Sequence, residues 1–311
     1  FKAMFHLQVI DLFKGVMILL KVFRLGYVDF VTKDLEKLSE YYSEIIGFSK
    51  TFESHESAYF SSSTDHHNIA LHASHFTGIQ RIGLQLHADI SVQDAAKWLN
   101  NEGINTTVKT EARPGVPELA EFTDQDGYII QLFSSMEVAA SGFKRNSIAP
   151  NKVGHLSLRV KDAKRSVEFY KLLGFTNTDW IETFFGFMTC NSDHHVLNFC
   201  TSPEKAGEMH HLAFELRDYS HLAASLDFLG KHEIPILWGP SRHGAGHNIA
   251  TYHHDPDGNV IELFTDADVY IKELNRFEPR PWHRDNPQVP KVWGTDECIS
   301  QWGTDFEHAL V

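Results

Sequence analysis

Two kinds of hydrophobic pattern follow each other along this chain. Residues 155–160 alternate apolar and polar side chains, which predicts a half-buried strand. Asp162 is suited to cap a helix over residues 163–173, and Gly174 is suited to end it. A second helix is expected over residues 222–231, and strands account for most of the remaining pattern. The order of strand, helix and several strands predicts an α+β fold.

The same order of elements occurs in both halves of the chain. Gly-Phe follows the first helix of each half, Asp-His-His lies further along, and Asp-x-Asp-Gly precedes a late apolar run. These paired motifs lie at 47–48 and 174–175, at 65–67 and 193–195, and at 124–127 and 255–258. Matched positions remain about 127 to 131 residues apart, a register that chance similarity would not maintain. The sequence therefore predicts two copies of one domain.

The duplication sets the expected domain bounds. The first domain is expected over residues 17–145 and the second over residues 150–270, joined by a linker that contains Ser, Gly, Asn and Pro. Residues 1–16 are interpreted as a leader or an added extension, with the native start at Met17. Residues 271–311 form a C-terminal extension rich in Pro and Trp, which is expected to pack on the second domain as a candidate lid.

Composition and charge favour a globular protein over a nucleic-acid or membrane protein. The chain has 311 residues, of which 42% are hydrophobic and 22% are charged. A net charge of -13 argues against nucleic acid, which attracts clustered Lys and Arg. No apolar stretch is long enough to span a membrane. Cys190, Cys200 and Cys298 form no CxxC pair, so a reducing cytoplasm is the predicted location.

The duplication also provides an internal control for candidate metal ligands. Three strand positions of the second repeat carry His155, His211 and Glu262. The matched positions of the first repeat carry Tyr27, approximately Arg81, and Gln131. A purely structural need for His or Glu should appear in both repeats, whereas these side chains are present together in one and absent together from the other. Two imidazoles and a carboxylate form a facial triad, which suits non-heme Fe(II) and leaves coordination positions open.

The choice of His211 over the adjacent His210 rests on the strand frame. His211-Leu-Ala-Phe repeats the spacing of His155-Leu-Ser-Leu. Because side chains alternate along a strand, we expect His210 to face away from the site.

These motifs resemble those of the type I extradiol ring-cleavage dioxygenases of the vicinal oxygen chelate superfamily. The resemblance covers about residues 22–270 and is densest at 239–244 and 252–262. It implies two tandem vicinal-oxygen-chelate domains, each of two βαβββ modules around a curved mixed sheet. The N-terminal domain, which lacks the three ligands, is then expected to be metal-free, and the C-terminal domain to be catalytic.

The resemblance implies roles for three further residues. Tyr252 would hydrogen-bond a substrate oxygen, and His243 would line the substrate and assist its deprotonation. His194, in preference to His195, would lie beside the dioxygen site as an acid–base group. Imidazole suits that role because it exchanges protons near neutral pH. His66 is the counterpart of His194 in the metal-free repeat, so the Asp-His-His turn also has a structural interpretation.

Other residues are candidates for the surroundings of the metal. Arg242 could offset negative charge near the oxygen site, with Ser157 and His195 as further neighbours. Three departures from the family pattern lie near the substrate. Thr251 stands where an aliphatic residue usually precedes the Tyr, and His247 lies one residue closer than the usual His. Ser157 stands where Asn is common. The candidates for the cavity wall are Trp180, Phe187, Trp238 and Ile249.

The predicted function is extradiol cleavage of a catechol-type ring. The resemblance implies that Fe(II) binds both substrate hydroxyls beside O2 and that the product is of the muconic semialdehyde type. Mn(II) suits the same ligands. A homo-oligomer is expected, and the alternatives are a glyoxalase-like metal-dependent isomerase or lyase and a non-catalytic binding protein. An isomerase would need a second carboxylate, and none occurs at position 155, 211 or 131.

Overall fold

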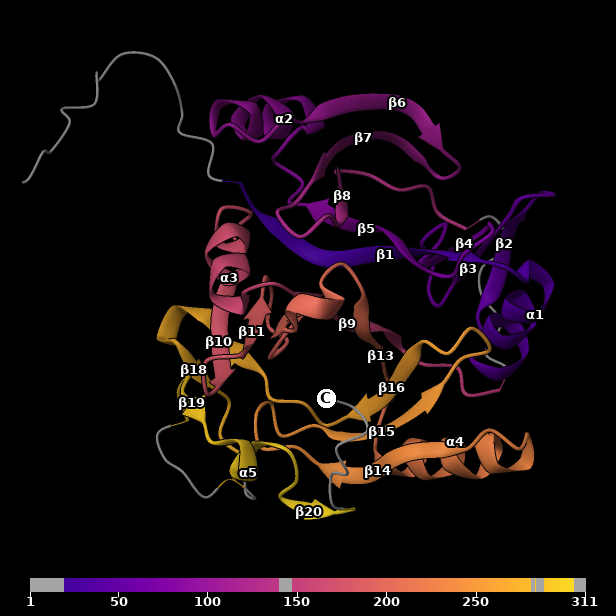
Figure 1. The fold of residues 1–311 in the computed structure, drawn as a ribbon, viewed down its shortest axis with the longest axis vertical. Coiled ribbons are helices and arrows are strands. Elements are labelled where there is room, and N and C mark those ends of the chain that lie inside the picture. The colour runs from indigo at the N-terminus through magenta and orange to yellow at the C-terminus, as the bar shows by residue number, and fades with distance from the viewer. Residues whose placement is uncertain (1–19, 140–146, 281–282, 284–287, 305–311) are drawn as a thin grey trace, which may run out of the picture.

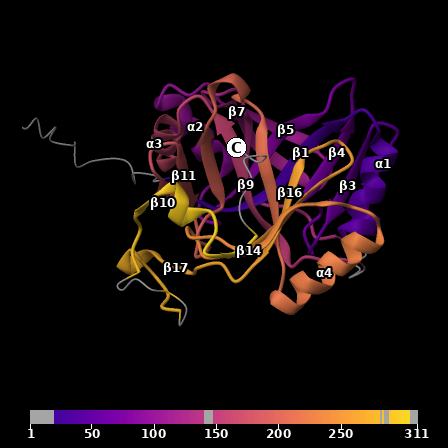
Figure 2. The ribbon, with the colours of Figure 1, turned by 60° about the horizontal axis from the view of Figure 1, so that its bottom comes forward.

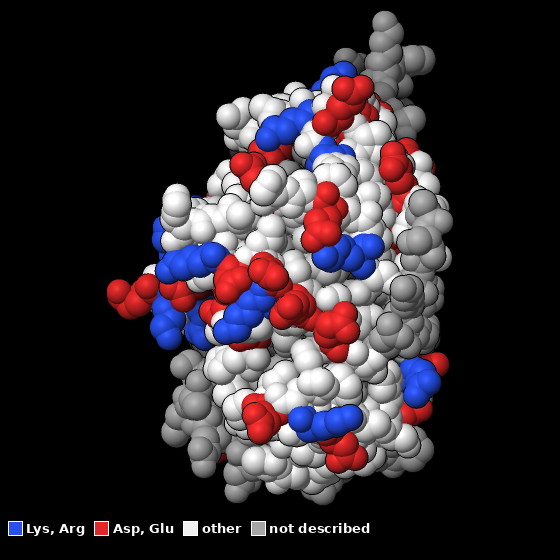
Figure 3. All heavy atoms as spheres, turned by 90° about the vertical axis from the view of Figure 1, so that its right-hand side faces the viewer, with Lys and Arg blue, Asp and Glu red and all other residues white. Residues whose placement is uncertain are grey.

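The computed structural model describes residues 20–139, 147–280, 283 and 288–304. The expected leader, the start at Met17 and part of the linker lie outside the described residues. No helix among those described is long and apolar enough to cross a membrane. Acidic and basic side chains are interspersed over the face drawn in Figure 3.

The first domain is built around one curled sheet with parallel and antiparallel pairing (Figure 1). Its eight strands lie in the order β2-β3-β4-β1-β5-β8-β7-β6. One βαβββ module runs from β1 to β4 and a second from β5 to β8. The elements are β1 (Val22–Thr32), α1 (Leu35–Glu40), a π-helical turn (Tyr41–Ile45), β2 (Ser49–Glu53), β3 (Ser57–Ser61), β4 (Ile69–Ala73), β5 (Gly78–Leu86), α2 (Val92–Asn101), β6 (Thr107–Arg113), β7 (Val116–Thr123) and β8 (Ile129–Phe133).

The second domain repeats both modules in a ten-stranded sheet. Its strand order is β19-β10-β11-β12-β9-β13-β16-β15-β14-β20, so the C-terminal extension supplies the two edge strands. The module elements are β9 (Lys152–Val160), α3 (Ala163–Lys171), β10 (Thr176–Ile181), β11 (Phe185–Thr189), β12 (Leu197–Thr201), a 3₁₀ turn (Pro203–Lys205), β13 (Met209–Glu215), α4 (Tyr219–Lys231), β14 (Ile236–Arg242), β15 (Ile249–His254) and β16 (Val260–Thr265). The predicted fold class is confirmed.

The first strands of the two modules meet at the centre of each sheet. In the second domain β9 pairs antiparallel with β13, which places His155 opposite Ala213. β16 pairs parallel with β13 and places Glu262 opposite the same Ala213. Side chains of three central strands therefore converge on one face of the sheet.

Side-chain caps set the helix starts. The Asp162 carboxylate accepts from the backbone N–H groups of Lys164 and Arg165, so α3 begins where expected. Asp218 accepts from the N–H of His221, so α4 begins at Tyr219, ahead of the predicted start at 222. The apolar pattern missed this first turn because its side chains are largely polar and exposed.

The two domains lie side by side (Figure 2), and aromatic and hydrogen-bonded contacts join them into one core. Phe48 of the first domain packs edge-on against Phe214 of the second, with ring centroids 5.2 Å apart. The Tyr170 hydroxyl donates to Asp124 across the same boundary at 2.9 Å. Tyr41 likewise lies within hydrogen-bond distance of His253.

The C-terminal extension lies against the second domain. After Phe264 the chain forms a hairpin of β17 (Tyr270–Ile271) and β18 (Arg276–Phe277) around the 3₁₀ turn Lys272–Leu274. β19 (Val292–Trp293) then pairs with β10, α5 (Thr295–Cys298) follows, and β20 (Trp302–Gly303) pairs with β14. The buried Trp293 packs in a cluster with Ile181, Phe185 and Phe187.

Candidate active site

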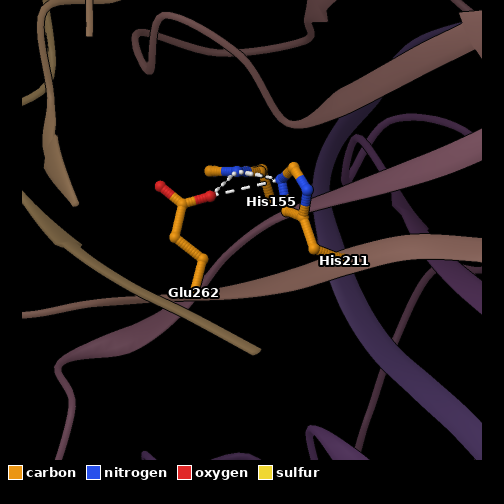
Figure 4. A group of neighbouring side chains, drawn as sticks. All are labelled: His155, His211 and Glu262. Atoms are coloured by element: carbon orange, nitrogen blue, oxygen red, sulfur yellow. Dashed lines mark hydrogen bonds and ion pairs between the residues drawn. The ribbon is translucent and has the colours of Figure 1, made fainter. Parts of the chain in front are cut away.

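Three central strands of the second domain bring His155, His211 and Glu262 together (Figure 4). Nε2 of His155 lies 3.0 Å from Oε2 of Glu262 and 3.1 Å from Nε2 of His211. Nε2 of His211 lies 3.2 Å from the same Glu262 oxygen. One atom of each side chain thus points to a common centre.

Burial and the contacts between these side chains together set their charges. All three side chains are buried, and burial lowers the pKa of His211 well below its usual range. Burial opposes ionisation of Glu262, but the attraction and hydrogen bond of His155 outweigh it and hold the pKa of Glu262 below its ordinary value. A neutral imidazole and an ionised carboxylate are the forms that bind metals.

The donor set fits a divalent metal with open coordination positions. Two imidazole nitrogens and one carboxylate oxygen would bind the ion, as in a facial triad. Asn248 donates from Nδ2 to the other Glu262 oxygen, Oε1, at 2.8 Å. Such a bond orients a ligating carboxylate. Sequence reasoning missed Asn248, because its amide is aimed by a loop whose shape no strand pattern predicts.

The first domain has different side chains at the same register positions. Tyr27 lies opposite Gly83, which lies opposite Gln131, and Arg81 takes the position that His211 holds in the second domain. A Cβ at Gly83 would lie 2.3 Å from the Tyr27 ring, so the larger Tyr requires this Gly. Among the described residues of this domain, no three His, Cys, Asp or Glu ligand atoms converge.

A cavity of about 110 Å³ adjoins the three ligands. Its wall is mainly apolar, with Ile181, Phe184, Phe185, Phe187, Cys200 and Ile299. His243 and Tyr252 also face the cavity, and Nε2 of His243 lies 3.0 Å from the Tyr252 hydroxyl. Burial raises the pKa of Tyr252 well above its usual range, so its hydroxyl keeps its proton.

Comparison with known proteins fits this duplicated arrangement. Residues 24–132 and 152–263 both match the family model of the Glyoxalase/Bleomycin resistance protein/Dioxygenase superfamily. The chain belongs to this superfamily. Membership is the recognition made from the sequence, which is thereby confirmed, and the two matched ranges lie inside the expected domains.

The individual relatives of this protein are distant in sequence. The manganese-dependent 2,3-dihydroxybiphenyl 1,2-dioxygenase of Geobacillus genomosp. 3 is 22% identical, over 88% of this chain and 94% of its own. Homoprotocatechuate 2,3-dioxygenase of Brevibacterium fuscum, solved with 3,4-dihydroxyphenylacetate, superposes with a TM-score of 0.80 at 20% identity, over 96% and 94% of the two chains. A Mn(II)-bound glyoxalase of Novosphingobium aromaticivorans gives 0.79 at 23% identity, over 94% of each chain.

In this superfamily member, His195 takes the place that the sequence assigned to His194. The His195 ring lies 4.1 Å from that of His155 and lines the cavity. The buried His194 lies outside the cavity wall, where its Nε2 is 3.1 Å from Asp179 and its ring packs on Phe277. The expectation for His194 is therefore corrected, because the strand after the Asp-His-His turn aims the second imidazole, not the first, at the ligands.

The expectation that His210 faces away from the site is wrong. A β-bulge between Met209 and His211 breaks the alternation of side chains on β13. His210 consequently lines the cavity, with Nδ1 2.7 Å from Nδ1 of His211.

The remaining candidates are distributed around the cavity. Arg242 pairs with Asp266 at 3.0 Å and does not line the wall. Ser157 is buried opposite His211 in the β9–β13 register. Phe187 lines the wall as expected, whereas Trp180, Trp238 and Ile249 do not; Trp238 instead stacks behind His243 with ring centroids 4.9 Å apart.

Proposed function

We propose that this protein is an extradiol dioxygenase that cleaves a catechol-type ring next to its diol with O2. The observation that carries the proposal is the convergence of His155, His211 and Glu262 at one end of a buried aromatic cavity. Fe(II) is the proposed metal, and Mn(II) suits the same three ligands.

The three ligands would hold the metal on one side and leave its other positions toward the cavity. The chemistry that Fe(II) supplies when bound is to hold the two substrate oxygens and dioxygen together and to let charge pass between them. Asn248 would fix the Glu262 carboxylate and thereby the orientation of the site.

Tyr252 and His243 are proposed to bind and deprotonate the diol. The Tyr252 hydroxyl is neutral and can donate to a substrate oxygen. Nε2 of His243, which lies 3.0 Å from that hydroxyl, can accept a proton. Nδ1 of His243 lies 2.8 Å from the carbonyl oxygen of Ile299, which fixes the ring. The stacked Trp238 supports the same orientation.

His195 is proposed as the acid–base group on the dioxygen side. It lines the cavity beside His155, and its Nδ1 lies 2.8 Å from Nδ1 of His194. His194 in turn contacts the buried Asp179, so a chain of side chains fixes the His195 ring. His194 is therefore a positioning residue in this proposal.

The cavity favours a catechol with an uncharged, apolar substituent. No Lys or Arg occurs among the described residues of its wall, so a substituent carboxylate would have no permanent cation to pair with. Phenylalanine rings and Ile299 would instead cover apolar ring carbons. Because Ile299 and Cys298 belong to the C-terminal extension, we propose that the extension also closes the cavity against water.

The dioxygenases among the relatives support dioxygenase chemistry, and the glyoxalase-like alternative rests on one structural neighbour that is named a glyoxalase. Glu262 is the only carboxylate among the described residues of the cavity wall. An isomerase that needs a second carboxylate as ligand or base has none here, which favours the dioxygenase.

The test is anaerobic reconstitution with Fe(II), followed by catechol, 4-methylcatechol and 3,4-dihydroxyphenylacetate in air. We expect yellow ring-fission products, with 4-methylcatechol preferred over the carboxylate-bearing substrate. The iron-free protein is the control. No colour from any catechol, despite stoichiometric bound iron, would favour the isomerase.

Two further expectations stay predictions. A homo-oligomer should appear in size-exclusion chromatography with light scattering. A cytoplasmic location should appear on fractionation of the source cells.

A further inference from the structure

We propose that the protein binds a second divalent metal, separate from the catalytic one, at His247, Asp268 and His283. One ligand atom of each lies within 4.8 Å of the other two. Nδ1 of His247 is 2.8 Å from Oδ2 of Asp268, and Nε2 of His283 is 2.9 Å from Oδ1 of the same carboxylate. The two imidazole rings lie 4.0 Å apart.

This cluster is buried, and its carboxylate lies between two imidazole nitrogens. The side chains of Asp268 and His283 are 2% and 1% exposed, and that of His247 is 11% exposed. Both oxygens of Asp268 face imidazole nitrogens, Oδ2 that of His247 and Oδ1 that of His283. A carboxylate and two imidazoles that converge in a buried place offer three ligand atoms to one cation.

The internal duplication locates the matching positions in the first domain. The backbone N–H of Asp268 donates to the carbonyl of Gly246 at 2.8 Å, and that of Glu137 donates to Gly115 in the same way at 2.8 Å. The residues that follow Asp268 and Glu137 each form an isolated bridge with the Asp of their Asp-His-His motif. Glu137 is therefore the counterpart of Asp268.

The first domain lacks the other ligands. His247 follows Gly246, and the residue that follows Gly115 is Val116, which is fully buried. His283 belongs to the C-terminal extension, which has no equivalent in the first domain. The backbone of this corner consequently does not require imidazoles, since its other copy is formed with Val and Glu. Among the described residues, the two imidazoles accompany the carboxylate in the second domain and not in the first.

The position of the cluster indicates a structural role. It ties the loop of His247 and the segment after β16 to the C-terminal extension. Trp293 packs edge-on against His247, with ring centroids 5.6 Å apart, and limits access of water. A metal here would fix the extension that supplies Ile299 to the cavity wall.

The donor set identifies the class of metal. Two imidazoles and one carboxylate suit Zn²⁺, with water as a fourth ligand, better than Ca²⁺ or Mg²⁺, which prefer oxygen ligands. Arg242 donates to the carbonyl of His247, but its charge is paired with Asp266. Because Asp266 offsets the charge of Arg242, this arginine does not oppose a cation at the cluster.

The experiment measures Zn²⁺ stoichiometry by equilibrium dialysis of the full chain, followed by elemental analysis. After removal of metal by a chelator, the wild-type protein should bind two Zn²⁺ ions per chain. Glu262→Gln should bind one, because only the catalytic site is lost, and Asp268→Asn should also bind one. Glu137→Gln, the matched change in the first domain, should bind two.

The remaining ion should have its own signature. In Glu262→Gln, Zn²⁺ should raise the melting temperature and Co²⁺ should give a visible absorption band, and His283→Gln added to that variant should remove both. This second variant serves if Asp268→Asn does not fold. Failure of Glu262→Gln to bind Zn²⁺, or unchanged stoichiometry in a folded Asp268→Asn, would overturn the proposal. Neither result depends on catechol turnover, so the proposed function is judged separately.

Discussion

The Tyr27 hydroxyl donates a 2.7 Å hydrogen bond to Oε1 of Gln131. These two residues hold in the first domain the register positions that His155 and Glu262 hold in the second. Arg113 donates to the same Gln131 oxygen at 3.0 Å, and the Gln131 amide donates to a carboxylate. One scaffold thus holds a hydrogen-bonded polar network in one copy and converging candidate metal ligands in the other.

Tyr27→Phe should weaken the first domain without affecting metal. The change removes one buried hydrogen bond, while Gln131 keeps Arg113 as a donor, so the free energy of unfolding should fall by about 1 kcal/mol. Urea denaturation measures the loss, and elemental analysis of the same sample measures metal. Loss of bound metal in this variant would contradict the assignment of the site to the second domain.

Glu262→Gln should abolish binding of the catalytic metal. The substitution turns one carboxylate oxygen into an amide nitrogen and removes the negative charge. The amide oxygen that remains can still accept the hydrogen bond from Asn248. Loss of an outer hydrogen bond costs about 10- to 100-fold in affinity, so loss of a ligand should cost more than about 100-fold. Competition with a chelator of known affinity measures the change.

The control for that experiment is the matched position of the first domain. Gln131→Met removes polar groups at the same register of the duplicated sheet and should leave metal affinity at the wild-type value. Full ring-cleavage activity in Glu262→Gln would exclude Glu262 as a ligand.

Much of the fold was predictable because the sequence contains the same pattern of elements twice. The two copies of one pattern supported each other, and motifs such as Asp-x-Asp-Gly aligned the matched positions of the two halves. The three candidate ligands could be singled out because Tyr27 and Gln131 show which other side chains the same positions carry in the first repeat. Comparison between repeats replaces, in this case, a comparison between homologues.

The errors of the sequence analysis have three causes: a bulge, a lack of contrast between the repeats, and the geometry of loops and chain ends. The bulge before His211 turns His210 into the cavity, and an alternating pattern cannot show a bulge. The choice between His194 and His195 failed because both have counterparts in the first repeat, so duplication gave no contrast. Asn248 and the extension residue Ile299 reach the site through loop and chain-end geometry, which hydrophobic periodicity does not encode.

His195→Gln should impair turnover while the metal is retained. His195 lines the cavity but is not among the converging ligand atoms, so its loss should remove proton transfer and lower kcat about 100- to 10,000-fold. Steady-state kinetics and metal analysis on one preparation measure both. Loss of metal in parallel with activity would make His195 a structural support of the ligands instead.

His194→Gln tests the corrected assignment from the other side. Because His194 contacts Asp179 outside the cavity, the variant should lose stability and alter kcat less than His195→Gln does. A larger loss of kcat in His194→Gln than in His195→Gln would restore the original prediction.

The contact between Tyr41 and His253 should make the domain boundary sensitive to acid. Nε2 of His253 lies 2.7 Å from the Tyr41 hydroxyl, and both side chains are buried. Burial, aided by the nearby His254, lowers the pKa of His253 from 6.5 to about 4. An unfolded chain accepts this proton near pH 6.5, whereas the folded chain resists it until about pH 4.

The sign of the effect follows from that difference. The neutral His253 contributes its full stability above pH 6.5, and the contribution falls as the pH falls toward 4. Between pH 7.5 and pH 5 the loss should be about 2 kcal/mol. His253→Gln keeps an acceptor for Tyr41 but has no proton to gain. Urea denaturation of metal-free protein at both pH values should therefore show a smaller loss of stability in the variant than in the wild type, by about 2 kcal/mol. Equal losses in the two proteins would show that the boundary histidine is protonated without cost.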